Sequence, residues 1–222
     1  MAYLDFVNRK GSRSRSSGID VAAADLNAAL FDWQKSCVRR SLSIGRFALF
    51  EDCGLGKTIQ QGSWAHEVAR HTGSRGLIVA PLGGGDQTIA ELQRFGIDSG
   101  RDETSRIQVI NYERLHKVDA SQFAGVVLDE SSILKSVDGK TKQRILEMFA
   151  DTPYKLACTA TPAPNDVTEL GNHAEFLGVM TNAEMLASFF VNKGQGRQSW
   201  ELKGHASEAF YEWLATWSVF VS

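Results

Sequence analysis

Residues 46–58 read RFALFEDCGLGKT, and this stretch decides the fold class. It starts as a short apolar run, passes through a turn with two glycines, and leads into a run with helical spacing. A strand, a glycine turn and a helix in this order form a phosphate cradle. Glycines let backbone N–H groups converge on phosphate oxygens, and the helix N-terminus adds a positive dipole. The predicted cradle consists of Gly54, Leu55, Gly56, Lys57 and Thr58.

Two side chains of this turn carry the chemistry of a nucleotide site. Lys57 has the reach to contact the β- and γ-phosphates, and the Thr58 hydroxyl is a ligand for Mg²⁺. The strict pattern GxxxxGK[ST] is not met, because Glu51 stands where the first glycine belongs. A plain glycine turn at a strand-to-helix junction is the alternative. The strand before the turn and the helix after it favour the phosphate cradle.

A second acidic segment completes the predicted site. Residues 126–132 read VVLDESS, an apolar strand that ends in Asp129 and Glu130. In a parallel sheet, ligands bind at the carboxyl ends of the strands, so Asp129 is expected beside the cradle, where it holds Mg²⁺. Glu130 is expected to orient or deprotonate the attacking water. An Asp-Glu pair after a strand is common by itself, and its pairing with the glycine turn gives it weight.

Alternating apolar strands and helical runs surround these two segments. Strands are predicted at 46–50, 76–80, 107–110, 125–128 and 154–158, and helices at 26–43, 58–71, 86–95 and 139–149. This alternation predicts an α/β fold in which a parallel sheet is covered by helices on both faces. Together with the glycine turn and the acidic pair, this alternation indicates a phosphate-loop NTPase.

The ends of the chain differ from this central region. Residues 8–18 are rich in Ser, Gly, Arg and Lys, so a flexible basic lead-in is expected over 1–25. The lobe itself is expected over 26–180. Beyond it, helical runs at 185–191 and 206–219 predict a helical extension over 181–222.

Composition sets limits on the function. The chain has 222 residues, a formal net charge of -2 and 23% charged residues, so its overall charge does not indicate a nucleic-acid binder. Its three cysteines form no CxxC pair and indicate a reducing compartment. No apolar run reaches the roughly 18 residues of a membrane span. A reducing, cytoplasmic setting without a membrane partner is therefore expected.

Taken together, the motifs resemble helicase superfamily 2, and within it the Swi/Snf-like ATPases, particularly the compact forms of phages and prophages. In that group the loop reads D-E-x-G-L-G-K-T, which is similar to EDCGLGKT at 51–58. The acid that breaks the strict pattern is therefore expected from the resemblance. At 129–132 serines replace the last two residues of the family's DEAH-type segment, while both acids remain.

The resemblance extends to further segments and implies roles for them. Gln34, in FDWQ, is similar to the adenine-reading glutamine of the family. Pro81 and Gln87 lie where the family contacts the DNA backbone, and NYE at 111–113 resembles a neighbouring segment. TATP at 159–162, followed by Asn165 and Glu169, resembles the motif that couples hydrolysis to nucleic-acid binding. Its implied coupling residues are Thr159, Ala160 and Thr161.

The resemblance implies an ATP hydrolase that works on DNA, most simply on duplex DNA, with ATP and Mg²⁺ at the site. Such motors have two RecA-like lobes, and the second supplies arginines that stabilise the transferring phosphoryl group. No second lobe is recognisable here, so one is expected in cis or in trans, and an isolated chain is expected to hydrolyse ATP slowly at most. Two alternatives remain: a nucleotide-binding regulatory module without turnover, and an unrelated phosphate-loop kinase or NTPase.

Overall fold

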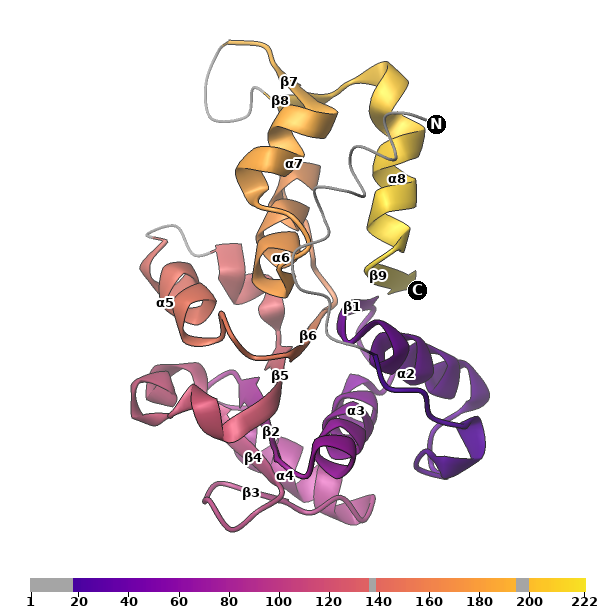
Figure 1. The fold of residues 1–222 in the computed structure, drawn as a ribbon, viewed down its shortest axis with the longest axis vertical. Helices are drawn as coiled ribbons and strands as arrows, with labels where there is room; N and C mark the ends of the chain where they lie inside the picture. Colours follow the sequence, from indigo (N-terminus) through magenta and orange to yellow (C-terminus); the bar gives the residue numbers. More distant parts are fainter. Residues whose placement is uncertain (1–17, 136–138, 195–199) are drawn as a thin grey trace.

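The computed structural model describes residues 18–135, 139–194 and 200–222 (Figure 1). Its centre is a seven-stranded sheet in the order β3-β4-β2-β5-β6-β1-β9, and every neighbouring pair is parallel. The strands are β1 (Arg46–Glu51), β2 (Arg75–Ala80), β3 (Ser99–Gly100), β4 (Ile107–Asn111), β5 (Phe123–Asp129), β6 (Tyr154–Thr159) and β9 (Ser218–Val221). The predicted parallel α/β fold is confirmed.

Helices cover both faces of the sheet. On one face lie α2 (Asp32–Ile44), α3 (Lys57–Thr72) and α4 (Gly85–Arg94). On the other lie α5 (Lys140–Met148), α6 (Leu170–Leu177), α7 (Asn182–Phe189) and α8 (Ser207–Ala215). Strand β1 shows why, because Phe47 and Leu49 enter one apolar core while Ala48 and Phe50 enter the other. Alternate residues of a strand point to opposite faces, so a strand buried on both sides is apolar throughout.

The C-terminal region contains the helices expected at 185–191 and 206–219, as α7 and α8, together with strands that its sequence did not predict. Helix α8 ends at Ala215, and residues 218–221 form β9, which pairs in parallel with β1. The main-chain N–H of Ala48 donates to the Trp217 carbonyl at 2.9 Å, so β9 continues the sheet. A small antiparallel pair, β7 (Phe190–Asn192) with β8 (Trp200–Leu202), also interrupts the helices. The spacing of the aromatic side chains favoured a helix up to residue 219. It gave no sign that residues 218–221 would pair with the edge of β1.

The N-terminal region differs from its prediction as well. Helix α2 begins at Asp32, whereas the sequence predicted helix from residue 26. The Asn27 side chain accepts from the N–H of Ala29 at 3.0 Å and forms a turn instead. Within the expected flexible lead-in, Ile19 and Val21 are buried against the core, whereas residues 18, 20 and 22–25 are exposed. Residues 1–17, which include nearly all of the basic segment, lie outside the described residues. Among the described residues, no helix is long and apolar enough to cross a membrane.

Candidate nucleotide site

The glycine turn after β1 requires its glycines. Gly54 has a φ of 85° and Gly56 a φ of 73°, both in the left-handed region that disfavours other residues. A Cβ on Gly56 would also lie 2.7 Å from Nε2 of Gln34, whereas one on Gly54 would meet nothing within 4 Å. The turn therefore brings its backbone close to the Gln34 side chain and leads directly into α3.

Lys57, the first residue of α3, folds back over this turn. Its Nζ donates to the carbonyls of Glu51 at 2.8 Å and Asp52 at 3.0 Å. Thr58 follows it in the first turn of α3 and is partly exposed. The ammonium and the hydroxyl thus both lie at the N-terminus of α3, where the helix dipole favours an anion.

Glu51 occupies the position of the missing glycine and lies beneath the turn. It is buried, and its Oε2 accepts a hydrogen bond of 2.7 Å from Nε2 of Gln60. Burial raises the pKa of the Glu51 carboxyl above its ordinary value, while Gln60 and Lys57 act in the opposite direction. The acid therefore supports the turn from below, through the side of α3 that faces the sheet.

The structure brings Gln34 to the turn. Its side chain is buried; Oε1 accepts from the N–H of Phe31 at 2.9 Å, and Nε2 donates to the Leu55 carbonyl at 2.8 Å. Gln34 thereby links the start of α2 to the phosphate loop. Next to it, the rings of Phe31 and Trp33 are 69% and 37% exposed. Large exposed aromatic rings beside a polar site are suited to stacking against a planar ligand.

Asp129 and Glu130 lie at the same edge of the sheet as the glycine turn. Asp129 is the last residue of β5 and Glu130 follows it, and β5 is separated from β1 only by β6. Oδ1 of Asp129 accepts from Nε2 of Gln61 at 2.8 Å, and its carbonyl accepts from the Tyr112 hydroxyl at 2.7 Å. Both the carboxylate and the backbone of Asp129 are therefore fixed, and Oδ2 has no partner among the described contacts.

Glu130 is held by the strand that lies between the two segments. It is the one non-glycine residue with a positive φ, 51°, among the described residues, which marks a constrained turn of the kind found at functional sites. Oγ1 of Thr159, the last residue of β6, donates to Oε2 of Glu130 at 3.2 Å and accepts from the N–H of Thr161 at 3.1 Å. One hydroxyl thus connects the second acid with residues 159–164, called here the coupling loop.

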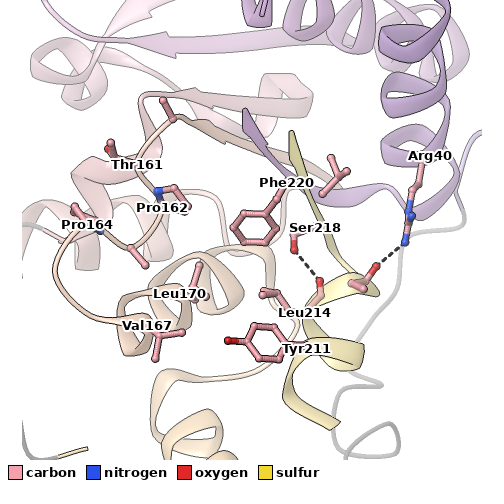
Figure 2. Close-up of a pocket in the computed structure, with 14 residues that line it drawn as sticks. Arg40, Thr161, Pro162, Pro164, Val167, Leu170, Tyr211, Leu214, Ser218 and Phe220 are labelled. Carbon is pink, nitrogen blue, oxygen red and sulfur yellow. Dashed lines mark hydrogen bonds between the residues drawn. The ribbon is translucent and has the colours of Figure 1, made fainter. Parts of the chain in front are cut away.

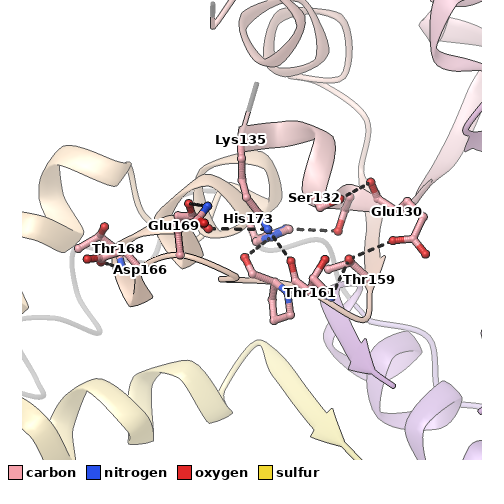
Figure 3. A network of polar contacts seen from close by, with 12 residues as sticks. Glu130, Ser132, Lys135, Thr159, Thr161, Asp166, Thr168, Glu169 and His173 are labelled. Atoms are coloured by element: carbon pink, nitrogen blue, oxygen red, sulfur yellow. Dashed lines mark hydrogen bonds and ion pairs between the residues drawn. The ribbon is translucent and has the colours of Figure 1, made fainter. Parts of the chain in front are cut away.

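A lysine fixes the coupling loop from another direction. Lys135 ends the 3-10 helix η4 (Ser131–Lys135), and its Nζ donates to the Thr161 carbonyl at 2.5 Å. The same ammonium lies 3.7 Å from Oε2 of Glu169 at the start of α6 (Figure 3). Desolvation lowers the pKa of Lys135, and Glu169 opposes that change. Ala160, which lies between Thr159 and Thr161 in the loop, makes no side-chain hydrogen bond.

The predicted DNA-contacting residues lie further along the same edge. Pro81 directly follows β2, on the other side of β5 from the phosphate loop, and Gln87 is exposed in the first turn of α4. Leu82 between them is 66% exposed. These residues lie at the edge of the sheet that carries the acids, but neither of them contacts the acids or the cradle.

An apolar groove with a volume of about 710 Å³ lies beside the coupling loop. The loop forms one wall, and α8 and β9 form the other, with Tyr211 and Phe220 among the lining residues (Figure 2). These two rings are 56% and 53% exposed.

Sequence reasoning missed several residues of this site. Gln61 is four residues after Lys57, one turn further along the same face of α3, and this spacing was the available signal. Tyr112 was noticed only within the NYE segment, and nothing local indicated that its hydroxyl reaches Asp129. Lys135 and His173 contact the coupling loop only because the fold brings them together, and no local sequence pattern predicts these contacts.

A parallel sheet with a glycine turn after one strand and an acidic pair two strands away defines the RecA-like phosphate-loop class. The chain belongs to the SNF2-related domain family, whose model matches residues 57–193. Its fold is that of a helicase-like SNF2 ATPase core. The resemblance to Swi/Snf-type ATPases is thereby confirmed.

Solved structures agree with this assignment. A SWI2/SNF2 ATPase core from Sulfolobus solfataricus, in complex with dsDNA, matches with a TM-score of 0.69 at 21% identity, over 90% of this chain and 46% of that one. The UvsW helicase from bacteriophage T4 matches with a TM-score of 0.57 at 16% identity, over 80% of this chain and 65% of that one. The chain thus spans about half to two thirds of these relatives. No match was found among curated proteins.

Proposed function

We propose that this chain is the ATP-binding lobe of a DNA-dependent ATPase that couples Mg-ATP hydrolysis to movement on DNA. One observation carries the proposal. The lysine of the glycine turn and the Asp-Glu pair lie at one edge of the sheet, and Thr159 on the strand between them bonds to Glu130. Membership of the SNF2-related family supports ATP as the nucleotide.

The residues present fit a magnesium nucleotide. Hard oxygen donors suit Mg²⁺, which usually takes only one or two carboxylates and keeps phosphate and water as its other ligands. Thr58 and Asp129 supply a hydroxyl and a carboxylate oxygen. Within the described ranges no group of three or more His, Cys, Asp or Glu residues forms a metal cage by itself. When bound, the ion would neutralise charge on the phosphates.

The side chains of the chain itself then have distinct tasks. Lys57, which donates to two carbonyls of its own turn, would exchange those acceptors for phosphate oxygens. Glu130 would orient or deprotonate the attacking water, in a position set by the Thr159 hydroxyl. Asp129 would keep the orientation that Gln61 gives to its carboxylate.

Adenine recognition is assigned to the start of α2. Gln34 already bonds to the phosphate loop, and its buried amide can offer at most one further N–H to a base. Phe31 and Trp33 expose their rings beside it. We therefore expect the base to stack near these rings while Gln34 reads its edge.

DNA and a second lobe are the proposed partners. The Sulfolobus relative was solved with dsDNA, and this chain spans 46% of its length, which supports a duplex substrate and a further lobe in cis or in trans. The apolar groove beside the coupling loop supplies surface for such a lobe. Pro81 and Gln87 are assigned to the DNA backbone. The likeness to a phage helicase supports a setting in the cytoplasm of a bacterium or a phage-infected cell.

The proposal is tested by nucleotide binding and steady-state hydrolysis. Wild type, Lys57→Ala and Glu130→Gln are compared with no nucleic acid, duplex DNA, single-stranded DNA and RNA. Mg-ATP binding that Lys57→Ala loses, with hydrolysis that duplex DNA stimulates and Glu130→Gln abolishes, is expected of the completed motor. Binding without turnover, even when a second lobe is added, would support a regulatory module instead. Absence of binding by the folded wild-type chain would refute the proposal.

A further inference from the structure

His173 lies fully buried on α6, between the acidic segment and the coupling loop. Its Nε2 is 3.2 Å from the Pro162 carbonyl oxygen, and its Nδ1 is 3.4 Å from Oγ of Ser131. A carbonyl only accepts, so Nε2 must carry a proton. Burial lowers the pKa of His173 to about 3, so the ring is neutral and Nδ1 accepts from the serine hydroxyl. The hydrogen bonds therefore run in one direction, from Ser131 through His173 to Pro162.

The ring is also fixed by packing. Phe50, next to the end of β1, meets it edge-on with 5.1 Å between ring centroids and an angle of 67°. The imidazole thus touches the strand that leads into the phosphate loop, the segment after the acids, and the coupling loop. Figure 3 shows His173 among Lys135, Thr161 and Glu169, which form the other attachment of that loop.

The two attachments hold consecutive carbonyls of the coupling loop. Lys135 binds the carbonyl of Thr161, and His173 binds that of Pro162. Ser131, which is fully buried, directly follows Glu130. Because Ser131 is the next residue in the chain, a shift of the Glu130 backbone would displace Ser131 and the hydrogen bond that it donates.

We propose that His173 is a positioning residue that makes Glu130 and the coupling loop move as one unit, through Ser131 and the Pro162 carbonyl. The inference rests on the proposed function, because it assigns to His173 the transmission of a nucleotide-dependent change. The sequence motifs do not indicate this role for His173. Serines occupy the two positions after the acids, and the histidine lies 42 residues beyond Ser131. A change at the acids reaches the coupling loop, and with it the apolar groove, through this ring.

The test compares four variants with wild type in the full chain. His173→Phe keeps the ring packing and removes both hydrogen bonds, while His173→Gln retains a donor for the Pro162 carbonyl. Ser131→Ala removes the donor on the other side, and the double variant Ser131→Ala/His173→Phe completes the cycle. Leu177→Val is the control, because it loosens a buried position of the same helix without touching either hydrogen bond.

Two quantities are measured for each variant: the affinity for a fluorescent ATP derivative, and hydrogen exchange with and without magnesium adenylyl imidodiphosphate. In wild type we expect the nucleotide to slow exchange in residues 129–135 and in residues 159–166. In His173→Phe the affinity should stay within about threefold, while the slowing at 159–166 falls by more than half and that at 129–135 remains. His173→Gln should recover part of it, and the double variant should match His173→Phe, because the two side chains act in series.

A second measurement needs no variant. Nitrogen-15 spectra of the imidazole should show a neutral ring with the proton on Nε2 from pH 6 to pH 8. A charged ring, or a proton on Nδ1, would contradict the hydrogen-bond direction and overturn the inference. It would also be overturned if His173→Phe transmitted the nucleotide effect to 159–166 as wild type does, or if Leu177→Val lost it equally. If folded wild type bound no nucleotide, the proposed function would fall, and the inference with it.

Discussion

Lys155 offers a stability prediction whose size can be worked from the structure. It lies on β6 with 3% of its surface exposed; its Nζ donates to the Phe176 carbonyl at 3.2 Å and lies 5.4 Å from the centroid of that ring. Burial, with a smaller contribution from Arg46, lowers the pKa of the ammonium from 10.5 to about 7. A charged group is thus held in an apolar region with one hydrogen bond and one ring as compensation.

The direction of the pH effect follows from this lowered pKa. Between about pH 7 and pH 10.5 the unfolded chain keeps the lysine proton and the folded chain releases it, so the free energy of unfolding rises with pH. Each pH unit corresponds to at most about 1.4 kcal/mol, which sets an upper limit of about 5 kcal/mol at pH 7. The hydrogen bond to the Phe176 carbonyl and the contact with its ring offset part of this destabilisation. We therefore expect Lys155→Met to raise the free energy of unfolding by about 1–3 kcal/mol at pH 7.

Urea unfolding at pH 7, 8 and 9 measures this effect, with Lys117→Met, at an exposed position, as the control. The advantage of Lys155→Met over wild type should shrink by roughly 1 kcal/mol per pH unit, whereas the control should show a small difference that does not vary with pH. An advantage that stays constant across the three pH values, or a variant less stable than wild type at pH 7, would refute the reasoning.

Two further predictions concern the nucleotide site. Gly56→Ala must both adopt a strained φ and displace Gln34, whereas Gly54→Ala meets the strain alone; we expect roughly tenfold weaker nucleotide binding for the first than for the second, and equal affinities would contradict the contact with Gln34. Thr159→Val removes the hydroxyl that binds Glu130 and should lower the free energy of unfolding by about 1–2 kcal/mol, whereas Thr159→Ser should stay close to wild type. Thermal or urea unfolding compares the two Thr159 variants, and indistinguishable curves would show that the hydroxyl contributes little.

The central sheet and the cradle were predictable because their signals are local. The glycine turn, the apolar strands and the Asp-Glu pair each occupy a few consecutive residues, and parallel-sheet geometry fixes which ends meet. The sequence therefore located Lys57, Asp129 and Glu130 at one edge without any knowledge of side-chain contacts. What these residues do when nucleotide is added remains a prediction.

The parts that sequence missed depend on distant contacts. Residues 218–221 lie in a run with helical spacing, and only the unpaired edge of β1 makes them a strand. The ring of His173 meets Ser131 across 42 positions of chain, and Tyr112 meets Asp129 across 17. Sequence periodicity cannot predict such contacts, because they arise from the packing of elements that are far apart in the chain.

The position of β1 within the sheet bears on synthesis by the ribosome. Ala48 pairs with Ala157 on one side and with Ser218 on the other, 109 and 170 residues further along the chain. Contacts between such distant segments form late and slow folding. The strand that carries the phosphate loop therefore emerges early but acquires its last neighbour only once residue 221 has left the exit tunnel. Until then one edge of β1 lacks its partner strand, and an unpaired strand edge is open to wrong pairing.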